Sequence, residues 1–200
     1  TTRELGLMIK RAGINFNALP DEDFDDPLGE DTGAGVIFGA TGGVMEAAVR
    51  TANAWVNGAT EPLELTAVRG TASIKETTVN VGGQELKLCV ASGISNAKWV
   101  MDQLKAGNPR GWGFIEIMAC PGGCVNGGGQ PIQPQYVRDT NDLKALRAKA
   151  LYDQDKGMEL RMSHESPVIK TLYSEWYDGF GGHKAHHDLH TSYTPRKKYE

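Results

Sequence analysis

The sequence predicts an α/β fold: a mixed, largely parallel sheet flanked by helices, with a β-hairpin and a C-terminal helical wrap. Strand-forming side chains recur at every second position over residues 77–81 and 86–90, and the pair Gly82-Gly83 between them suits a two-residue turn. Residues 112–118 form an apolar run interrupted by Glu116, which is typical of a strand covered on both faces. Segments with a helical period surround these strands and favour an α/β arrangement.

The N-terminal part begins with a helix, because Thr1 and Glu4 form a capping box ahead of apolar residues that share one helical face. An acidic loop with two prolines follows over residues 19–31. Thr41 is the expected cap of a second helix. We therefore expect the glycine-rich residues 33–43 to lead to the N-terminus of that helix.

A third helix starts at Ser95 or Asn96 and ends before the strand at residues 112–118. A segment rich in cysteine and glycine, residues 119–131, follows the C-terminal end of this strand. Open α/β sheets bind their ligands at that end of the strands. We therefore place the candidate site in residues 119–131.

The last sixty residues contain two further helical patterns. One begins behind a cap at Thr140 or Asn141, and the other begins at Ser166-Pro167. The charged run at residues 153–161 is interpreted as a solvated face, and the tail from Asp178 onward is assigned no element. We expect an α/β part over residues 1–140 and a helical segment over residues 141–200 that packs on it.

Composition excludes several classes of function. The net charge of -4 gives no positive field for a phosphate backbone, so nucleic acid is not an expected partner. The longest apolar runs fall far short of the roughly 20 residues of a membrane helix, so no membrane span is expected. Three cysteines without a dense disulfide framework favour a reducing compartment, and the expected location is the cytoplasm.

Two of the three cysteines carry the main chemical signal. Cys120 and Cys124 are separated by Pro-Gly-Gly, which cannot hold a regular strand and can turn both sulfur atoms toward one point. Such a loop suits an iron–sulfur cluster, whose properties are tuned by amide hydrogen bonds to sulfur. The alternatives are a glycine-rich turn with incidental cysteines, or a zinc site that two thiolates would leave half-ligated. Cys89 lies within a strand and is interpreted as a packing or half-exposed residue.

The glycine-rich residues 33–43 and the C-terminal histidines give weaker signals. Residues 33–43 lack a Gly-Lys-Ser/Thr, and Phe38 occupies the third glycine position of a dinucleotide fingerprint, which argues against nucleotide binding. We expect close backbone packing beside a pocket there, with the helix N-terminus at Thr41 directed toward an anionic cluster. A group of histidines could be proposed as zinc or nickel ligands, but a structural role is preferred for His183, His186, His187 and His190.

Residues 114–120 (FIEIMAC) together with 127–131 (GGGQP) resemble the third signature motif of the iron–iron (FeFe) hydrogenases. The resemblance covers essentially the whole chain. It continues through residues 2–5, 33–48, 151–152, 163–165 and 186–190.

The resemblance implies a 4Fe-4S cube joined through a cysteine sulfur to a two-iron unit, together called the H-cluster. By position, Cys120 resembles the third cube ligand and Cys124 the fourth, whose sulfur bridges to the two-iron unit. Met118 resembles the methionine that packs against the two-iron unit, and Phe38 an aromatic residue on the wall of its pocket. The family's first and second motifs, which supply the other cube ligands and the proton donor, have no counterpart here.

The resemblance therefore implies the C-terminal part of an FeFe hydrogenase catalytic domain, in which residues 1–140 are the α/β part of the large subunit and residues 141–200 are small-subunit-like. Such an enzyme interconverts dihydrogen with protons and electrons. Its implied partners are the N-terminal remainder of the hydrogenase and ferredoxin or NAD(P)-linked electron-transfer modules. We expect the chain by itself to be inactive and to hold an incomplete cofactor or none. The alternatives are a non-catalytic iron–sulfur-binding relative of the cluster-assembly type and an apo structural domain.

Overall fold

The computed structural model describes residues 1–23, 25, 29 and 31–195. In this part of the chain one three-stranded sheet has the order β1-β2-β3, with β1 at Ile74–Val81, β2 at Gln84–Ser92 and β3 at Trp112–Met118. The predicted hairpin joins β1 and β2 in antiparallel register, and β2 pairs with β3 in parallel register. The mixed sheet is confirmed, and one of its two pairings is parallel.

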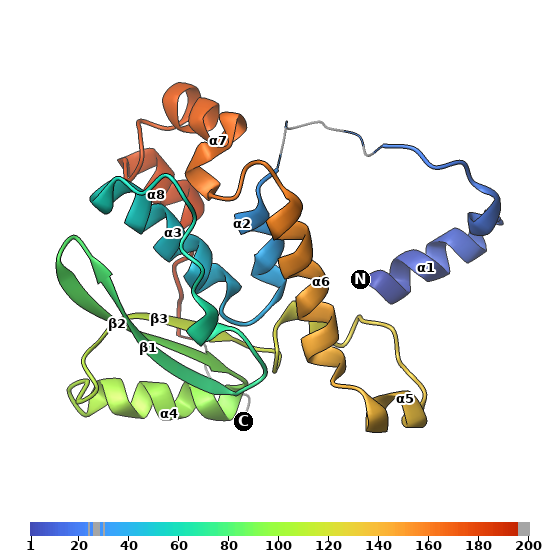
Figure 1. Cartoon of the computed structure of the whole chain (residues 1–200), viewed down its shortest axis with the longest axis horizontal. Coiled ribbons are helices and arrows are strands. Elements are labelled where there is room, and N and C mark those ends of the chain that lie inside the picture. Colours follow the sequence, from blue (N-terminus) through green and yellow to red (C-terminus); the bar gives the residue numbers. More distant parts are fainter. Residues whose placement is uncertain (24, 26–28, 30, 196–200) are drawn as a thin grey trace.

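Two helices sandwich this sheet (Figure 1): α3 (Gly43–Asn57) covers one face and α4 (Ile94–Lys105) the other. Successive side chains of a strand point to opposite faces of the sheet, so alternate residues of β2 pack in two separate cores. Leu88 and Val90 pack with Met45 of α3. Cys89 is fully buried and packs with Val100 of α4, which agrees with its interpretation as a packing residue.

The prediction that residues 112–118 are covered on both faces is wrong. In β3, Phe114 is 38% exposed and Ile117 is 46% exposed. The strand buried on both faces is β2, because it lies between β1 and β3. In the described part of the chain, β3 is an edge strand.

The start of α3 differs from the prediction that Thr41 caps the helix. The helix begins at Gly43, after Gly42 in a left-handed conformation with φ of 96°. The carboxylate of Glu116 on β3 accepts hydrogen bonds from the backbone N–H groups of Gly42 and Met45, each at 2.7 Å. The positive end of α3 is therefore matched by a buried side chain of the protein.

The C-terminal segment forms a helical layer against the glycine-rich region. Helix α5 spans Gln135–Thr140, and α6 spans Leu143–Gly157 with Asp142 as its cap, one or two residues later than predicted. Tyr152 of α6 shares a core with Ile37 and Ala40. These two residues lie in and just after η2 (Ile37–Gly39), a 3-10 turn that follows the short helix α2 (Gly33–Val36).

Between residues 167 and 189 the chain forms short helical pieces that lie beside α3 (Figure 1). Helix α7 (Pro167–Thr171) is capped by Ser166, as predicted, and continues into a π-helical turn at Leu172–Trp176. Helix α8 (His183–Leu189) occupies part of the tail to which no element was assigned, so that prediction is wrong. Single 3-10 turns also occur at Phe16–Ala18, Thr66–Val68 and Ser163–Glu165.

Helix α1 (Thr2–Arg11) has the predicted capping box, with the Thr1 hydroxyl accepting from the Glu4 N–H. In Figure 1 it lies away from the sheet, and none of its residues is buried. The predicted acidic loop lies partly outside the described residues. Among the residues that are described, we find no helix that is both long and apolar enough to cross a bilayer.

Candidate functional site

Residues 119–131, here called the cysteine loop, leave the sheet at the end of β3. The carbonyl of Met118 accepts a hydrogen bond from Gly93 N–H at 2.8 Å, which ties the last residue of β3 to the start of α4. The Gly123 N–H then donates to the Cys120 carbonyl at 2.9 Å and closes a tight turn. A 3-10 turn, η4 (Cys124–Asn126), follows immediately. The two cysteines thus begin two consecutive turns of one loop.

Glycines allow other parts of the chain to approach this loop closely. Gly123 has φ of 100°, and a Cβ there would lie 2.5 Å from the Gly39 carbonyl oxygen and 2.6 Å from the Thr41 nitrogen. The Thr41 N–H also donates to the Gly122 carbonyl at 3.2 Å. The expectation of close backbone packing at residues 33–43 is confirmed. Residues 39–41 lie directly against the turn between the cysteines.

The two loop thiols differ in exposure from the third cysteine. Cys124 is exposed and Cys120 is half-buried, and a Cβ at Gly127 would lie 3.8 Å from the Cys120 sulfur. Cys89 is buried beneath α4, where desolvation raises the pKa of its thiol to about 11. A thiol in that state is a poor metal ligand because the thiolate is the ligating form. In the ranges that the structure covers, no group of three or more His, Cys, Asp or Glu side chains could hold a metal ion.

Phe38 and Met118 lie on different elements. Phe38 is in η2, next to the Gly39 that contacts the cysteine turn, and its side chain is 45% exposed. It lines an apolar groove of about 370 Å³ that runs along α3 to Trp55. Met118 is half-buried at the end of β3, two residues before Cys120. Met118 therefore precedes the cysteine loop directly on the strand, whereas Phe38 is connected to the cysteine turn through its neighbour Gly39 and its side chain lines the groove along α3.

Helix α6 supports the cysteine loop from the other side. The Arg147 guanidinium donates to the Val125 carbonyl at 3.1 Å and to the Pro131 carbonyl at 2.8 Å. Two further side chains of α6 reach the same region: Lys144 lies against Gly122, and Leu151 lies against Gly39. Arg147 was not among the residues predicted for the site, because its sequence context shows only that it shares a helical face with Leu151.

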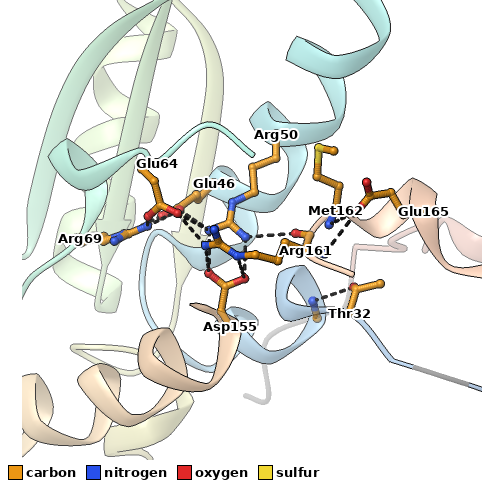
Figure 2. A network of polar contacts seen from close by, with 10 residues as sticks. Thr32, Glu46, Arg50, Glu64, Arg69, Asp155, Arg161, Met162 and Glu165 are labelled. Carbon is orange, nitrogen blue, oxygen red and sulfur yellow. Dashed lines mark hydrogen bonds and ion pairs between the residues drawn. The ribbon is translucent and has the colours of Figure 1, made fainter. Parts of the chain in front are cut away.

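A buried ion-pair network joins α6 to α3 (Figure 2). Arg50 is fully buried and donates to Glu46 at 2.7 Å and to both carboxylate oxygens of Asp155 at 2.8 and 2.9 Å. Arg161 pairs with Asp155 at 2.6 Å and with Glu64 at 2.6 Å. The interpretation of residues 153–161 as a solvated face is therefore wrong for Asp155, which has no exposed surface, whereas Asp153, Lys156 and Glu159 of this run are exposed. Asp155 is buried because its charge is matched by two arginines.

The network shifts the pKa values of its members. Burial alone would raise the pKa of Asp155, but hydrogen bonds from Arg50 and Arg161 outweigh burial, and the pKa is lowered. The pKa of Glu64 is lowered in the same way by hydrogen bonds from Arg161 and Arg69. Both carboxyl groups are therefore held in their charged form in the folded protein.

The C-terminal histidines lie on or beside α8, and the described residues around them provide no metal site of three ligands. The rings of His186 and His190 stack with their centroids 4.3 Å apart, and His187 pairs with its neighbour Asp188. His164 contacts the Thr51 hydroxyl at 3.1 Å, and desolvation lowers its pKa. The structural interpretation of the histidines stays a prediction.

Residues 1–128 match the family described as iron only hydrogenase large subunit, C-terminal domain. This chain belongs to the iron-only hydrogenase family. Residues 141–196 match a second family of these hydrogenases, described as iron hydrogenase small subunit. The boundary between the matches falls just before α6, so the network of Figure 2 connects the two matched segments.

Relatives within the iron-only hydrogenase family are longer than this chain. The chain is 45% identical to the NADP-reducing hydrogenase subunit HndD of Solidesulfovibrio fructosivorans, covering 99% of itself and 33% of that protein. It is 44% identical to iron hydrogenase 1 of Clostridium pasteurianum, covering 96% of itself and 34% of that protein. Protein NAR1 of Arabidopsis thaliana is 31% identical over 98% of this chain and 41% of its own length.

Solved structures of iron-only hydrogenases show the same fold. A variant of FeFe-hydrogenase HydA1 from Chlamydomonas reinhardtii superposes with a TM-score of 0.69 and 37% identity, covering 95% of this chain and 53% of that chain. A second FeFe-hydrogenase, described in work on oxygen inactivation of its H cluster, has a TM-score of 0.69 and 39% identity with the same coverage. The chain therefore spans about half of these structures and between 33% and 41% of the three relatives above.

The residues of the cysteine loop fit part of the ligand set of an iron–sulfur cluster. Such clusters are held by thiolates, usually four, and tuned by amide hydrogen bonds to sulfur. Cys120 and Cys124 supply two thiols on a glycine-rich cradle, and the only other cysteine is buried elsewhere. The donor chemistry of these two thiols fits two positions of a four-thiolate set.

Proposed function

We propose that this chain is the C-terminal part of the catalytic domain of an FeFe hydrogenase, which reversibly oxidises dihydrogen to protons and electrons. One observation carries the proposal: Cys120 and Cys124 begin two consecutive glycine-containing turns at the end of β3, with residues 39–41 packed against the turn between them. Identities of 45% and 44% to two hydrogenases over nearly the whole chain support it.

In this proposal, Cys120 and Cys124 would hold the iron–sulfur part of the H-cluster through their thiolates. The bound H-cluster supplies the redox and hydrogen chemistry. The chain's own residues ligate the cube through thiolates, and Met118 and Phe38 give the pocket an apolar wall that excludes water. The other ligands and the proton donor come from the rest of the protein, so the chain alone is inactive.

We further infer that the chain divides into an α/β part, residues 1–140, and a small-subunit-like segment, residues 141–200, of which residues 196–200 lie outside the described part. The matches to large-subunit and small-subunit families support this division. The proposed partners are the N-terminal remainder of the hydrogenase and ferredoxin or NAD(P)-linked modules; one relative is named as NADP-reducing. A cytoplasmic location stays a prediction, since one relative is named as periplasmic.

The test uses the full-length protein matured with its cofactor. We expect infrared bands from iron-bound carbon monoxide and cyanide, together with hydrogen evolution. The Cys124→Ser variant is expected to lose both, while Cys89→Ala keeps both because Cys89 lies in a different core. Hydrogen evolution by residues 1–200 alone would contradict the claim that this part is inactive.

A second candidate function is that of a non-catalytic iron–sulfur protein. It is favoured by the 31% identity to Protein NAR1 over 98% of the chain and by matches to probable cytosolic Fe-S cluster assembly factors. Such a protein would use the same two cysteines for an ordinary cluster. Iron and a cluster signal without carbon monoxide or cyanide bands, after proper maturation, would favour this candidate. Absence of both iron and a cluster signal would favour an apo structural domain.

A further inference from the structure

We infer that Arg147 is a positioning residue for the cluster ligand Cys124, and that the small-subunit-like segment acts on the cofactor through this side chain. The inference rests on the proposed function of the cysteine loop. It concerns a residue outside the large-subunit match, which ends at residue 128. Arg147 lies in the small-subunit match, on α6.

The contacts of Arg147 span the part of the cysteine loop that follows Cys124. One guanidinium nitrogen donates to the carbonyl of Val125, the residue after Cys124, at 3.1 Å. The other donates to the carbonyl of Pro131, at the end of the loop, at 2.8 Å. The two bonds therefore fix the distance between η4 and the end of the loop. Hydrogen bonds with a charged donor are about twice as strong as neutral ones.

The backbone hydrogen bonds nearest Cys124 are local. Cys124 is exposed, and the loop's internal bonds near it include Gly127 N–H to the Cys124 carbonyl at 2.9 Å and Gln130 N–H to the Gly127 carbonyl at 3.0 Å. These backbone bonds each close a single turn. The Gln130 side chain also donates to the Cys124 carbonyl at 3.5 Å, and Arg3 of α1 donates to the carbonyls of Gly128 and Gly129. Arg147 adds the link from α6 between η4 and the end of the loop, and so between its turns. The planar guanidinium of Arg147 bridges them in a fork geometry that a lysine cannot reproduce.

Helix α6 is itself anchored to the rest of the fold, so it can hold the Arg147 side chain in a fixed position. Asp142 caps its first turn by accepting from the N–H groups of Lys144 and Ala145, both at 3.1 Å. One turn after Arg147, Leu151 packs in the core with Ile37 and Ala40. Two turns after Arg147, Asp155 makes the buried pair with Arg50. Displacement of α6 would therefore move Arg147 and the Cys124 turn together.

The experiment compares variants of the full-length holoprotein. Outer contacts that orient a metal ligand are typically worth 10- to 100-fold in metal affinity, so we expect Arg147→Met to lose iron to a chelator about 10-fold faster than wild type. Its cluster should also show a changed electron paramagnetic resonance spectrum and a shifted midpoint potential. Arg147→Lys, which keeps the charge and one bond, should fall between Arg147→Met and wild type.

Two controls separate positioning from general stability. Lys149→Met removes an exposed cation from the same helix, one that pairs with Asp153 at the surface, and should leave iron loss and the spectrum unchanged. Val100→Ala destabilises the core under α4, away from the loop, and should lower the melting temperature without changing the spectrum. Arg147→Met that matches either control would overturn the inference.

The outcomes also distinguish this inference from the proposed function. If wild type and both controls hold the cluster and Arg147→Met loses iron no faster than they do, the inference is wrong and the proposed function stands. If the matured wild-type protein holds no cluster, both are wrong. If Arg147→Met fails to fold, Arg147→Lys decides through its spectrum and its rate of iron loss.

Discussion

The carboxylate of Asp155 on α6 lies 2.8 and 2.9 Å from the two guanidinium nitrogens of Arg50 on α3, and both side chains are completely buried. The two residues are 105 positions apart in the sequence and belong to the segments that match the small-subunit and large-subunit families. Removal of one partner would leave an uncompensated charge in the interior, which makes this pair a sensitive point of the fold.

Replacing one partner of this pair should be strongly destabilising. We expect Asp155→Ala to lower the free energy of unfolding by about 3–5 kcal/mol, because Arg50 would keep its charge without its main partner. Urea denaturation measures the change. Lys98→Ala, which removes an exposed ion pair with Asp102, is the control and should cost less than about 1 kcal/mol. Equal effects in the two variants would contradict the assigned role of Asp155.

The same network should give the protein an acid-labile component of stability. The pKa values of Asp155 and Glu64 are lowered on folding, so their stabilisation is present above the unfolded-state values of about 4 and is lost as the pH falls through the folded-state values. Urea midpoints measured from pH 6 to pH 3 should fall. The fall should be shallower for Asp155→Asn, and parallel curves would argue against this origin.

Burial of His164 predicts a second pH effect, at higher pH. The lowered pKa means that the folded state favours the neutral imidazole, so its stabilisation is present above the unfolded-state value of about 6.5 and declines as the pH falls below it. We expect a lower urea midpoint at pH 5 than at pH 7.5, and His164→Gln should reduce the difference. Nuclear magnetic resonance titration of the ring checks the direction, since a pKa above 6.5 would exclude this explanation.

Glu116 should matter more than a polar residue in an edge strand usually does. It accepts from the N–H groups of Gly42 and Met45 at the start of α3. We expect Glu116→Ala to cost about 2 kcal/mol of stability, as loss of a strong helix cap does, and Glu116→Gln to cost less because it keeps one acceptor oxygen. Thermal unfolding measures both variants. A Glu116→Ala variant as stable as wild type would show that α3 does not need this contact.

Two glycines of the cysteine loop give a matched test of the close approach of residues 39–41. A Cβ at Gly123 would collide with the Gly39 carbonyl oxygen, whereas a Cβ at Gly128 would meet nothing within 4 Å. We expect Gly123→Ala to lower stability by about 2 kcal/mol or more, from backbone strain and displacement, and to reduce iron content in the full-length protein. Gly128→Ala should match wild type in both measurements. Equal iron content in the two variants would argue against a constrained turn.

The amino-acid sequence by itself determined the features that depend on neighbouring residues. The capping box at Thr1, the hairpin around Gly82-Gly83 and the helix start at Ser166 were predicted correctly, because each involves residues within a few positions. The loop with Cys120 and Cys124 was located by its position after β3, and its resemblance to a hydrogenase motif agrees with the family match.

Only the tertiary structure decided which charged residues are buried and what they contact. The local pattern around Asp155 is that of a surface helix, and the partner that buries it lies 105 residues away. Glu116 was visible as an exception in an apolar strand, but its partners at the start of α3 were not. Arg147 gave no chemical signal at all, since its acceptors are backbone carbonyls. A charge can be buried only where folding brings partner residues to it. The pattern of neighbouring residues in the sequence does not indicate which distant residues those partners are.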